Sequence, residues 1–299
     1  MMIVTLARVV DSDVESSSQA TRRFEARQLA LTGIAYGMNA EIERGDPLFR
    51  QELEDGSELE VAVTSESARI NVNSVLGDVN DETLDAVLDV WEVPEEFSRV
   101  AVDSLRDWTD ENELRSLNGA EAEDLVGQSE YSIPENRDFI SVSEMERVRG
   151  VDAVISNRPD WAEIFSVHSD EKIDVQDAGS DVLRAVSGMS SEQADLLIET
   201  RNGPDLVPMT EDDLIFENLD QVTSVIGLTE NQRARLTSKF GVGSEPTRIE
   251  SAGTVGGVRY VITVIADRGG AGGSGAGDEN EARAGRPGGQ VKVLSWEEG

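Results

Sequence analysis

The stretch ELEVAVTSESARINVN, residues 58–73, decides the fold because here the sequence alternates like a β-strand. In its first half every second residue from Leu59 to Val63 is apolar, which places these side chains on one face of an extended chain. In its second half Ile70 and Val72 alternate with asparagines. The polar run SES between the halves is typical of a turn, so the pattern predicts two strands joined as a hairpin.

The residues before this stretch predict one long amphipathic helix over 14–44, ended by the Gly-Asp-Pro run. Its apolar stripe recurs at helical spacing and consists of Phe24, Leu31, Ile34, Met38 and Ile42. The small residues Ala30, Gly33 and Gly37 lie beside that stripe and permit close packing. They are candidates for contact with partner helices, and packing on the chain's own sheet is the favoured alternative.

The residues after it are helical in pattern from 74 to about 242, with helices expected at 95–108 and 119–126 among others, and then return to strand patterns. Residues 247–269 predict two strands around a Gly-Gly turn, and 290–296 predict a last strand after the Gly-rich run 269–289. This order predicts an α+β fold in which a helical domain is inserted between strands. The expected divisions are a helix over 1–46, a sheet domain from 47–73 with 244–299, and an inserted domain over 74–243.

The composition excludes several classes of function. A net charge of −34 opposes nucleic acid, because binding to phosphates depends on Lys and Arg, and it also opposes an anionic membrane surface. The absence of cysteine excludes disulfides, thiolate nucleophiles and Cys-ligated zinc, and a single histidine excludes a His-rich metal site. Few aromatic residues and no nucleophile motif indicate that the chain is not an enzyme. The acidic surface favours cations or a salty environment.

Residues 182–201, VLRAVSGMSSEQADLLIETR, resemble a helix-hairpin-helix with Gly188 at the turn. In forms that bind DNA, the hairpin offers backbone N–H groups to a phosphate, beside a second glycine and basic residues. This copy lacks the second glycine, and its second helix is acidic. A structural packing unit is therefore favoured, with DNA binding as the alternative.

The stretch LRDWTDENELRSLNGAEAED, residues 105–124, crowds carboxylates around Trp108. Calcium takes six to eight oxygen ligands from carboxylates, amides and carbonyls. The candidate ligands are Asp107, Asp110, Asn112 and Glu121. Their spacing is not that of an EF-hand, and from the residues alone a solvated acidic loop is favoured over a calcium site. Trp108 is expected to be a core anchor.

These motifs, in this order, resemble the minor pseudopilin K family of type II secretion systems (general secretion pathway protein K). The matching segments are Ile70-Asn71-Val72-Asn73, Asp107-Trp108, Asp110, Gly119-Ala120-Glu121, Asn136, Ser143-Glu144, Val148 and Gly150. The resemblance covers nearly the whole chain, and the order and spacing of the motifs carry it rather than any single one. One departure concerns the second Ile-Asn-x-Asn segment of the family pattern, at which this sequence reads Ile173-Asp174-Val175-Gln176.

The resemblance implies a pseudopilin fold, in which a long N-terminal helix packs on a small antiparallel sheet, with the helix-hairpin-helix in a large inserted helical domain. It implies a non-enzymatic protein at the tip of the periplasmic pseudopilus, where it joins two other minor pseudopilins and helps to start assembly and protein export. It also implies bound calcium, which favours the four candidate ligands.

Family members carry a basic leader and an apolar first helix, which this sequence lacks in large part. The expected location is the bacterial inner membrane, spanned once by the missing N-terminal segment, with the globular part in the periplasm. The alternative function is an exported helix-hairpin-helix protein that binds DNA or another partner.

Overall fold

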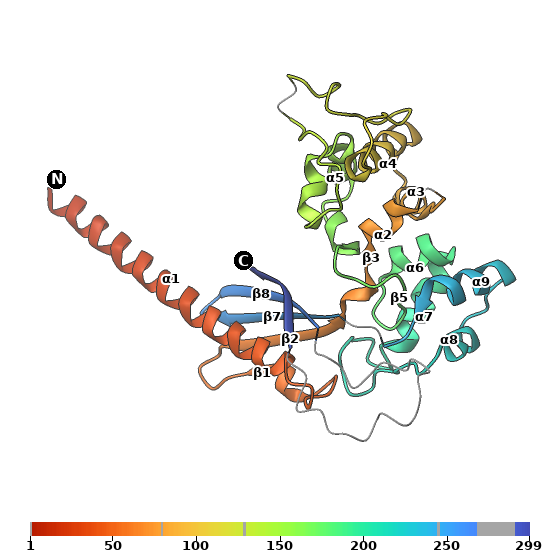
Figure 1. Ribbon diagram of the computed structural model, residues 1–299. Helices are drawn as coiled ribbons and strands as arrows, with labels where there is room; N and C mark the ends of the chain where they lie inside the picture. The colour runs from red at the N-terminus through yellow and green to blue at the C-terminus, as the bar shows by residue number, and fades with distance from the viewer. Residues whose placement is uncertain (1, 79, 128–129, 244–245, 268–290) are drawn as a thin grey trace. The chain divides into compact units, whose positions relative to one another are not determined.

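The decisive stretch 58–73 contains the point at which the chain leaves one structural unit for another. The computed structural model describes residues 2–78, 80–127, 130–243, 246–267 and 291–299 (Figure 1). The sheet unit consists of residues up to 64, 207–213 and those from 247 onward, and the helical unit consists of 65–206 and 214–246. The expected division at 73 and 74 thus lies nine residues after the observed one at 64 and 65.

The sheet unit is built on a five-stranded sheet with the strand order β1-β2-β7-β8-β9. Its strands are β1 (Arg50–Glu52), β2 (Glu58–Ser65), β7 (Thr247–Val255), β8 (Val258–Asp267) and β9 (Lys292–Glu298), and the 3-10 turn η1 (Pro47–Phe49) precedes β1. β7 and β8 pair antiparallel around Gly256 and Gly257, which both take positive φ as the predicted Gly-Gly turn requires. The Gly-rich run 269–289 lies outside the described residues.

Helix α1 (Met2–Gly37) lies along β7 and β8, and its first half extends past the sheet (Figure 1). Ala26, Ala30 and Ile34 are buried in the core that the helix shares with the sheet. A Cβ atom on Gly33 would lie 2.1 Å from the Ser251 Oγ, and one on Gly37 would lie 2.4 Å from the Ile249 Cγ2. The backbones approach this closely because both positions are glycine.

Ala30, Gly33 and Gly37 therefore contact the chain's own sheet, and the partner-contact role expected for them does not fit their burial. The predicted stripe is also wrong at Phe24, whose side chain is 62% exposed. Phe24 is two residues from Ala26, which places the two side chains on nearly opposite sides of a helix. Phe24 therefore points away from the face that packs on the sheet.

The hairpin predicted for 58–73 is wrong in its second half. After β2 the chain forms the 3-10 turn η2 (Glu66–Ala68), and β3 (Ile70–Asn71) then pairs parallel with β4 (Phe165–Ser166) inside the helical unit. Ile70 and Val72 are buried in that unit's core. The Asn71 side chain accepts hydrogen bonds from the N–H groups of Asn73 and Ser74, which starts a helix at residue 72 instead of continuing a strand.

The helical unit has one hydrophobic core, which includes Trp108, Leu183, Leu197 and Phe240. Two short turns, η3 (Val142–Arg147) and η4 (Trp161–Ile164), and the pair β5 (Ile173–Asp174) with β6 (Phe240–Gly241) complete it. Its α-helices are α2 (Val72–Gly77), α3 (Thr83–Val90), α4 (Glu95–Thr109), α5 (Val151–Asn157), α6 (Ser180–Ser187), α7 (Ser191–Arg201), α8 (Leu219–Val225) and α9 (Glu230–Lys239).

Helices α6–α7 and α8–α9 form two hairpins that bond to each other. Gly188 takes a left-handed conformation with φ of 74° between α6 and α7, as the hairpin turn requires. Gln193 and Gln232 complete capping boxes at the starts of α7 and α9. The Gln193 Nε2 also donates to the Gly227 carbonyl, and the Gln232 Nε2 donates to the Gly188 carbonyl at 2.7 Å. These hairpins thus cap one another, which is the behaviour of a packing unit.

Between these two hairpins the chain returns to the sheet unit over residues 207–213. The Arg44 Nε lies 3.1 Å from the Asp213 Oδ2, and that oxygen also accepts the N–H of Met209. The chain therefore crosses between the units four times instead of the two times expected for a simple insertion.

We expect Gly33→Ala to destabilise the sheet unit by roughly 1–3 kcal/mol, because the added methyl group overpacks a closed contact. Besides Ser251, this methyl group would meet the Val61 Cγ2 at 2.7 Å and the Leu59 Cδ1 at 2.9 Å. Urea denaturation followed by circular dichroism measures the change. Gly77→Ala is the control, since a Cβ there meets no atom within 4 Å. Equal stability of the two variants would contradict close packing at Gly33.

Candidate metal centre

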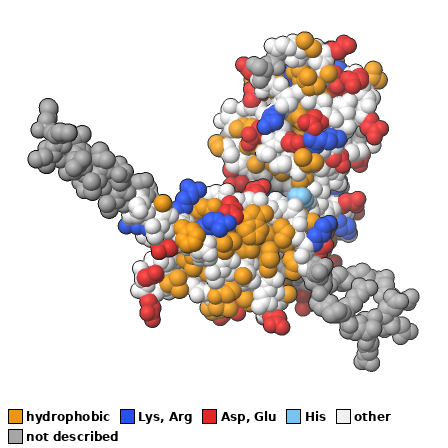
Figure 2. All heavy atoms as spheres, turned by 60° about the vertical axis from the view of Figure 1, so that its left-hand side comes forward, with side chains coloured by type: hydrophobic (Ala, Val, Ile, Leu, Met, Phe, Trp, Pro, Cys, Tyr) orange, Lys and Arg blue, Asp and Glu red, His pale blue; other side chains and the backbone are white. Residues whose placement is uncertain are grey.

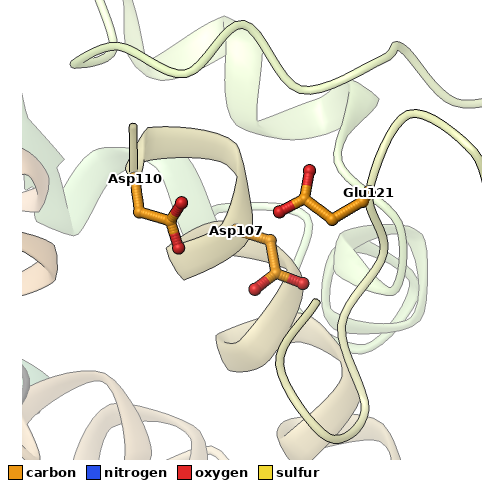
Figure 3. Close-up of side chains that lie close together, drawn as sticks. All are labelled: Asp107, Asp110 and Glu121. Carbon is orange, nitrogen blue, oxygen red and sulfur yellow. The ribbon is translucent and has the colours of Figure 1, made fainter. Parts of the chain in front are cut away.

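Three carboxylates meet beside the end of helix α4. Oxygen atoms of Asp107, Asp110 and Glu121 all lie within 4.8 Å of one another (Figure 3). Asp107 lies on the last turn of α4, and Asp110 is the residue that directly follows the helix. Glu121 comes from the loop that follows. The structure thus brings together three of the four predicted ligands.

The loop returns to the helix because α4 offers carboxylates to its backbone. Asp103 Oδ2 accepts from the N–H of Asn118 at 2.9 Å and from its Nδ2 at 2.9 Å. One turn further on, Asp107 Oδ1 accepts from the N–H of Ser116 at 2.9 Å. These bonds fold the loop back along α4 and deliver Glu121 to the end of the helix.

A helix expected at 119–126 is not formed, and the same kind of bond explains it. The N–H of Glu121 donates to the Asp124 Oδ2 at 3.0 Å, as in a turn stabilised by a side chain. Residues 122–127 form turns instead of a helix. The absence of the helix leaves the Glu121 side chain free to point at Asp107 and Asp110.

The fourth predicted ligand, Asn112, is placed differently from the other three. The Asp110 Oδ1 accepts the N–H of Asn112 at 2.9 Å, and the Asn112 Oδ1 accepts the N–H of Leu114 at 2.7 Å. The amide oxygen is thus turned to its own exposed loop. Consecutive Asx turns of this kind explain why an Asn at this spacing does not join the carboxylates.

Gly119 closes the site from the side of the loop. A Cβ atom there would lie only 1.9 Å from the Asp107 Oδ2, so no other residue fits without moving the carboxylate. The Gly119 carbonyl accepts from Arg149 Nη1 at 3.0 Å, which holds the loop in place. The roles of Asp103 and Gly119 were not predicted from the sequence. The spacing of residues 103, 107 and 110 on one helix face is the signal that could have indicated Asp103.

The electrostatics of the cluster are unfavourable for the chain alone. Glu121 is only 4% exposed, and its Oε1 has no hydrogen-bond partner. Burial first, and then the charges of Asp107, Asp110, Glu113 and Asp124, together raise the pKa of Glu121 to about 7. Among the described residues no Lys or Arg forms an ion pair with any of the three carboxylates. A bound cation would remove this repulsion.

The residues present fit a hard divalent cation such as calcium. Carboxylate oxygens are its preferred ligands, and the unpartnered Oε1 is a buried acceptor that needs a positive partner. Trp108 is confirmed as a core anchor beside this site. It is buried and stacks on Phe139, with ring centroids 5.6 Å apart and an angle of 4° between the planes.

A long helix lying on a small sheet, with a helical unit inserted into that sheet, defines the class of pseudopilin-like folds. The chain is similar to a chain of the crystal structure of the GspK-GspI-GspJ complex from the type 2 secretion system of enterotoxigenic Escherichia coli, with a TM-score of 0.58 and 16% identity. The match covers 97% of this chain and 99% of that one. At this identity the likeness shows the fold, and the predicted α+β class is confirmed.

Residues 68–158 match the family model of protein K of the type II secretion system (T2SS). The resemblance to the protein K family is thus confirmed, and the matched residues include the three carboxylates of the candidate centre. A search of curated proteins finds no match. Among the described residues, no helix has the length and apolar character that a membrane span requires.

In metal-free buffer we expect the stability of the protein to fall as the pH rises from 4.5 to about 7. Because the pKa of Glu121 is raised in the folded state, the unfolded state loses this proton at a lower pH than the folded state does. Deprotonation over this range therefore stabilises the unfolded state relative to the folded state. Denaturation midpoints across this range measure the effect. Glu121→Gln should flatten the dependence, and Glu123→Gln, at an exposed site in the same loop, should leave it intact. A wild-type profile as flat as that of Glu121→Gln would contradict the burial of a carboxyl group here.

Proposed function

We propose that this protein is a non-enzymatic minor pseudopilin at the tip of the type II secretion pseudopilus, where it helps to start assembly and export across the outer membrane. The observation that carries the proposal is the helical unit set into a pseudopilin-like sheet, in a chain whose residues 68–158 match protein K. The similarity in fold extends over nearly the full length of a chain from the GspK-GspI-GspJ complex of a type 2 secretion system.

The size of the inserted unit supports a position at the end of the filament. A helical filament repeats one head-to-tail interface, so each inner subunit is covered on both sides. A unit comprising residues 65–206 and 214–246 adds a second core to this subunit. Such a subunit suits an end, where only one side has to be covered.

The partners proposed for this chain are two other minor pseudopilins, by analogy with the composition of the similar complex. The proposed location is the bacterial inner membrane, spanned once by an apolar N-terminal segment, with both units in the periplasm. Nucleic acid is not among the proposed partners, because a net charge of −34 opposes contact with phosphates.

We also propose that Asp107, Asp110 and Glu121 hold a calcium ion. The cation would offset the repulsion among the three carboxylates and give the buried Glu121 Oε1 a partner. Because Asp107 lies in α4, Asp110 directly follows it and Glu121 comes from the loop, the ion would stabilise the folded loop against the end of the helix. Its role is structural, since calcium here would contribute binding energy only to the folded state.

The tip position predicts an uneven distribution along isolated pseudopili. We expect immunogold particles directed against residues of the helical unit to lie at one end of each filament. The reason is that the inserted unit cannot be repeated within the filament. Electron microscopy of filaments from cells that express all the pseudopilins gives the distribution, with labelled major pseudopilin as the control. Gold particles spaced along the length of the filament would contradict the proposed position at the tip.

The calcium proposal predicts that Tb³⁺ luminescence, excited through the adjacent Trp108, appears on binding and is displaced by Ca²⁺. Asp110→Asn should weaken binding by about tenfold or more, because affinity follows the charge of the ligand set. Glu111→Gln, at the neighbouring exposed carboxylate, is the matched control. Equal affinity of the two variants, or no response in the wild-type protein, would mean that the cluster holds no calcium.

A further inference from the structure

A groove of about 450 Å³ lies in the helical unit between helices α3 and α9. Both helices pack on α6, whose residues Ala185 and Val186 line the groove between them. We call it the α3–α9 groove, and it is lined mainly by residues within 80–89, 185–186 and 235–239. Its volume lies within the range of about 300–1,000 Å³ that is usual for ligand sites. The groove therefore suits a short segment of chain rather than a folded domain.

The wall of the groove that α3 forms is acidic. Glu82, Asp85 and Asp89 are spaced by three and four residues, so they share one face of the helix. Burial raises the pKa of Asp85, the charge of Arg106 opposes this shift, and the charges of Asp89 and Glu82 add to it. Among the described residues, neither Glu82 nor Asp89 forms an ion pair. This wall therefore favours a positive group.

The wall that α9 forms is basic. Arg235 and Lys239 are four residues apart and share one face of that helix. The Lys239 Nζ lies 2.6 Å from the Asp81 Oδ2, and this pair ties the end of α9 to the loop before α3. Arg235 forms no ion pair with any residue that the structure describes. Charges of opposite sign thus line one space without meeting across it.

Several ligands fit this groove poorly. Among the described residues, three carboxylates converge closely enough for a metal ion at Asp107, Asp110 and Glu121, and none of these lines the groove. A phosphate meets an excess of carboxylates, and an apolar ligand would take charged groups out of water. A uniformly basic segment meets Arg235 and Lys239 on the second wall. A ligand that carries both signs of charge remains.

An extended peptide can present opposite charges to the two walls, because its successive side chains point to opposite sides. Side chains two residues apart in such a peptide lie on the same side, about 6.6 Å from each other. Four residues of a helix, from Asp85 to Asp89 or from Arg235 to Lys239, rise by about 6 Å. The spacing of charges on each wall therefore matches every second residue of an extended peptide.

We propose that the α3–α9 groove binds an extended segment of a partner protein in which basic and acidic residues alternate. The basic side chains of this segment face Glu82, Asp85 and Asp89, and an acidic side chain faces Arg235. This binding does not depend on a position at the tip of a pseudopilus, because the lining residues all belong to the helical unit. It gives that unit a role in recognition.

The probe for this site has no net charge. Figure 2 shows acidic side chains spread over the visible face of the molecule, and a net charge of −34 attracts any basic peptide. We therefore compare a labelled hexapeptide of alternating Lys and Glu, blocked at both ends, with one of three Lys followed by three Glu. Fluorescence anisotropy with the full chain should show at least about threefold tighter binding of the alternating peptide, because each exposed ion pair adds a factor of about 1.5–5 in affinity.

Arg235→Glu should weaken binding of the alternating peptide by about three- to tenfold, because a repulsion replaces an attraction. Arg233→Glu is the matched control, since it makes the same change of charge on α9 outside the groove. Arg235→Lys should retain binding, and circular dichroism establishes that the variants fold. Equal losses in Arg235→Glu and Arg233→Glu, equal affinity for the two peptides, or no binding of the alternating peptide would overturn the inference.

The location of the bound peptide can be tested directly, because the chain contains no cysteine. Ser238→Cys places a single thiol in the groove, and a photo-crosslinker attached there should react with the alternating peptide. Ser156→Cys on α5 is the control, since both serines are exposed and donate to a carbonyl of their own helix. A product at residue 238 alone supports the inference. Products of equal yield at both positions overturn it and leave the proposed function intact.

Discussion

The close packing of α1 on the sheet is the constraint on which the sheet unit depends. Gly33 and Gly37 let the helix approach Ser251 and Ile249 with no side chain between them, and this seats α1 over β7 and β8. The helix is thereby fixed chiefly over these two strands, and β9 forms the edge of the sheet next to β8. A stripe of small residues thus determines how closely the helix lies on the sheet.

In the helical unit, carboxylates accept hydrogen bonds from backbone N–H groups of a loop, which in regular elements would be bonded to backbone carbonyls. Asp103 and Asp107 accept N–H groups of the loop that follows α4, and this folding creates the cluster with Glu121. The strongly acidic stretch is therefore partly structural, with side chains that cap turns, and partly a concentration of charge without a positive partner. The two roles are linked, since the bond from Ser116 to Asp107 positions a carboxylate that the proposed ion would share.

Local patterns predicted the elements that depend on local interactions. Helix α4 was expected at 95–108 and runs from Glu95 to Thr109, and the two strands around Gly256 are where the alternation placed them. The pairing of Ile70 with Phe165 could not be predicted, because two-residue strands far apart in the chain leave no periodic signal. The helix expected at 119–126 does not form, because helix propensities take no account of side-chain acceptors that compete for the backbone N–H groups. For the site, spacing on α4 brought Asp107 and Asp110 together, whereas Glu121 depends on the fold of the loop.

The path of the chain has a consequence for how this protein folds. Helix α1 and β2 come first, but β7 and β8, on which α1 packs, follow residue 246. The sheet unit cannot close until the helical unit has been synthesised, and contacts between such distant segments form slowly. During this interval the apolar face of α1 is uncovered and exposed to misassembly. The return of residues 207–213 places Asp213 beside Arg44, and both residues of this contact precede β7 in the chain.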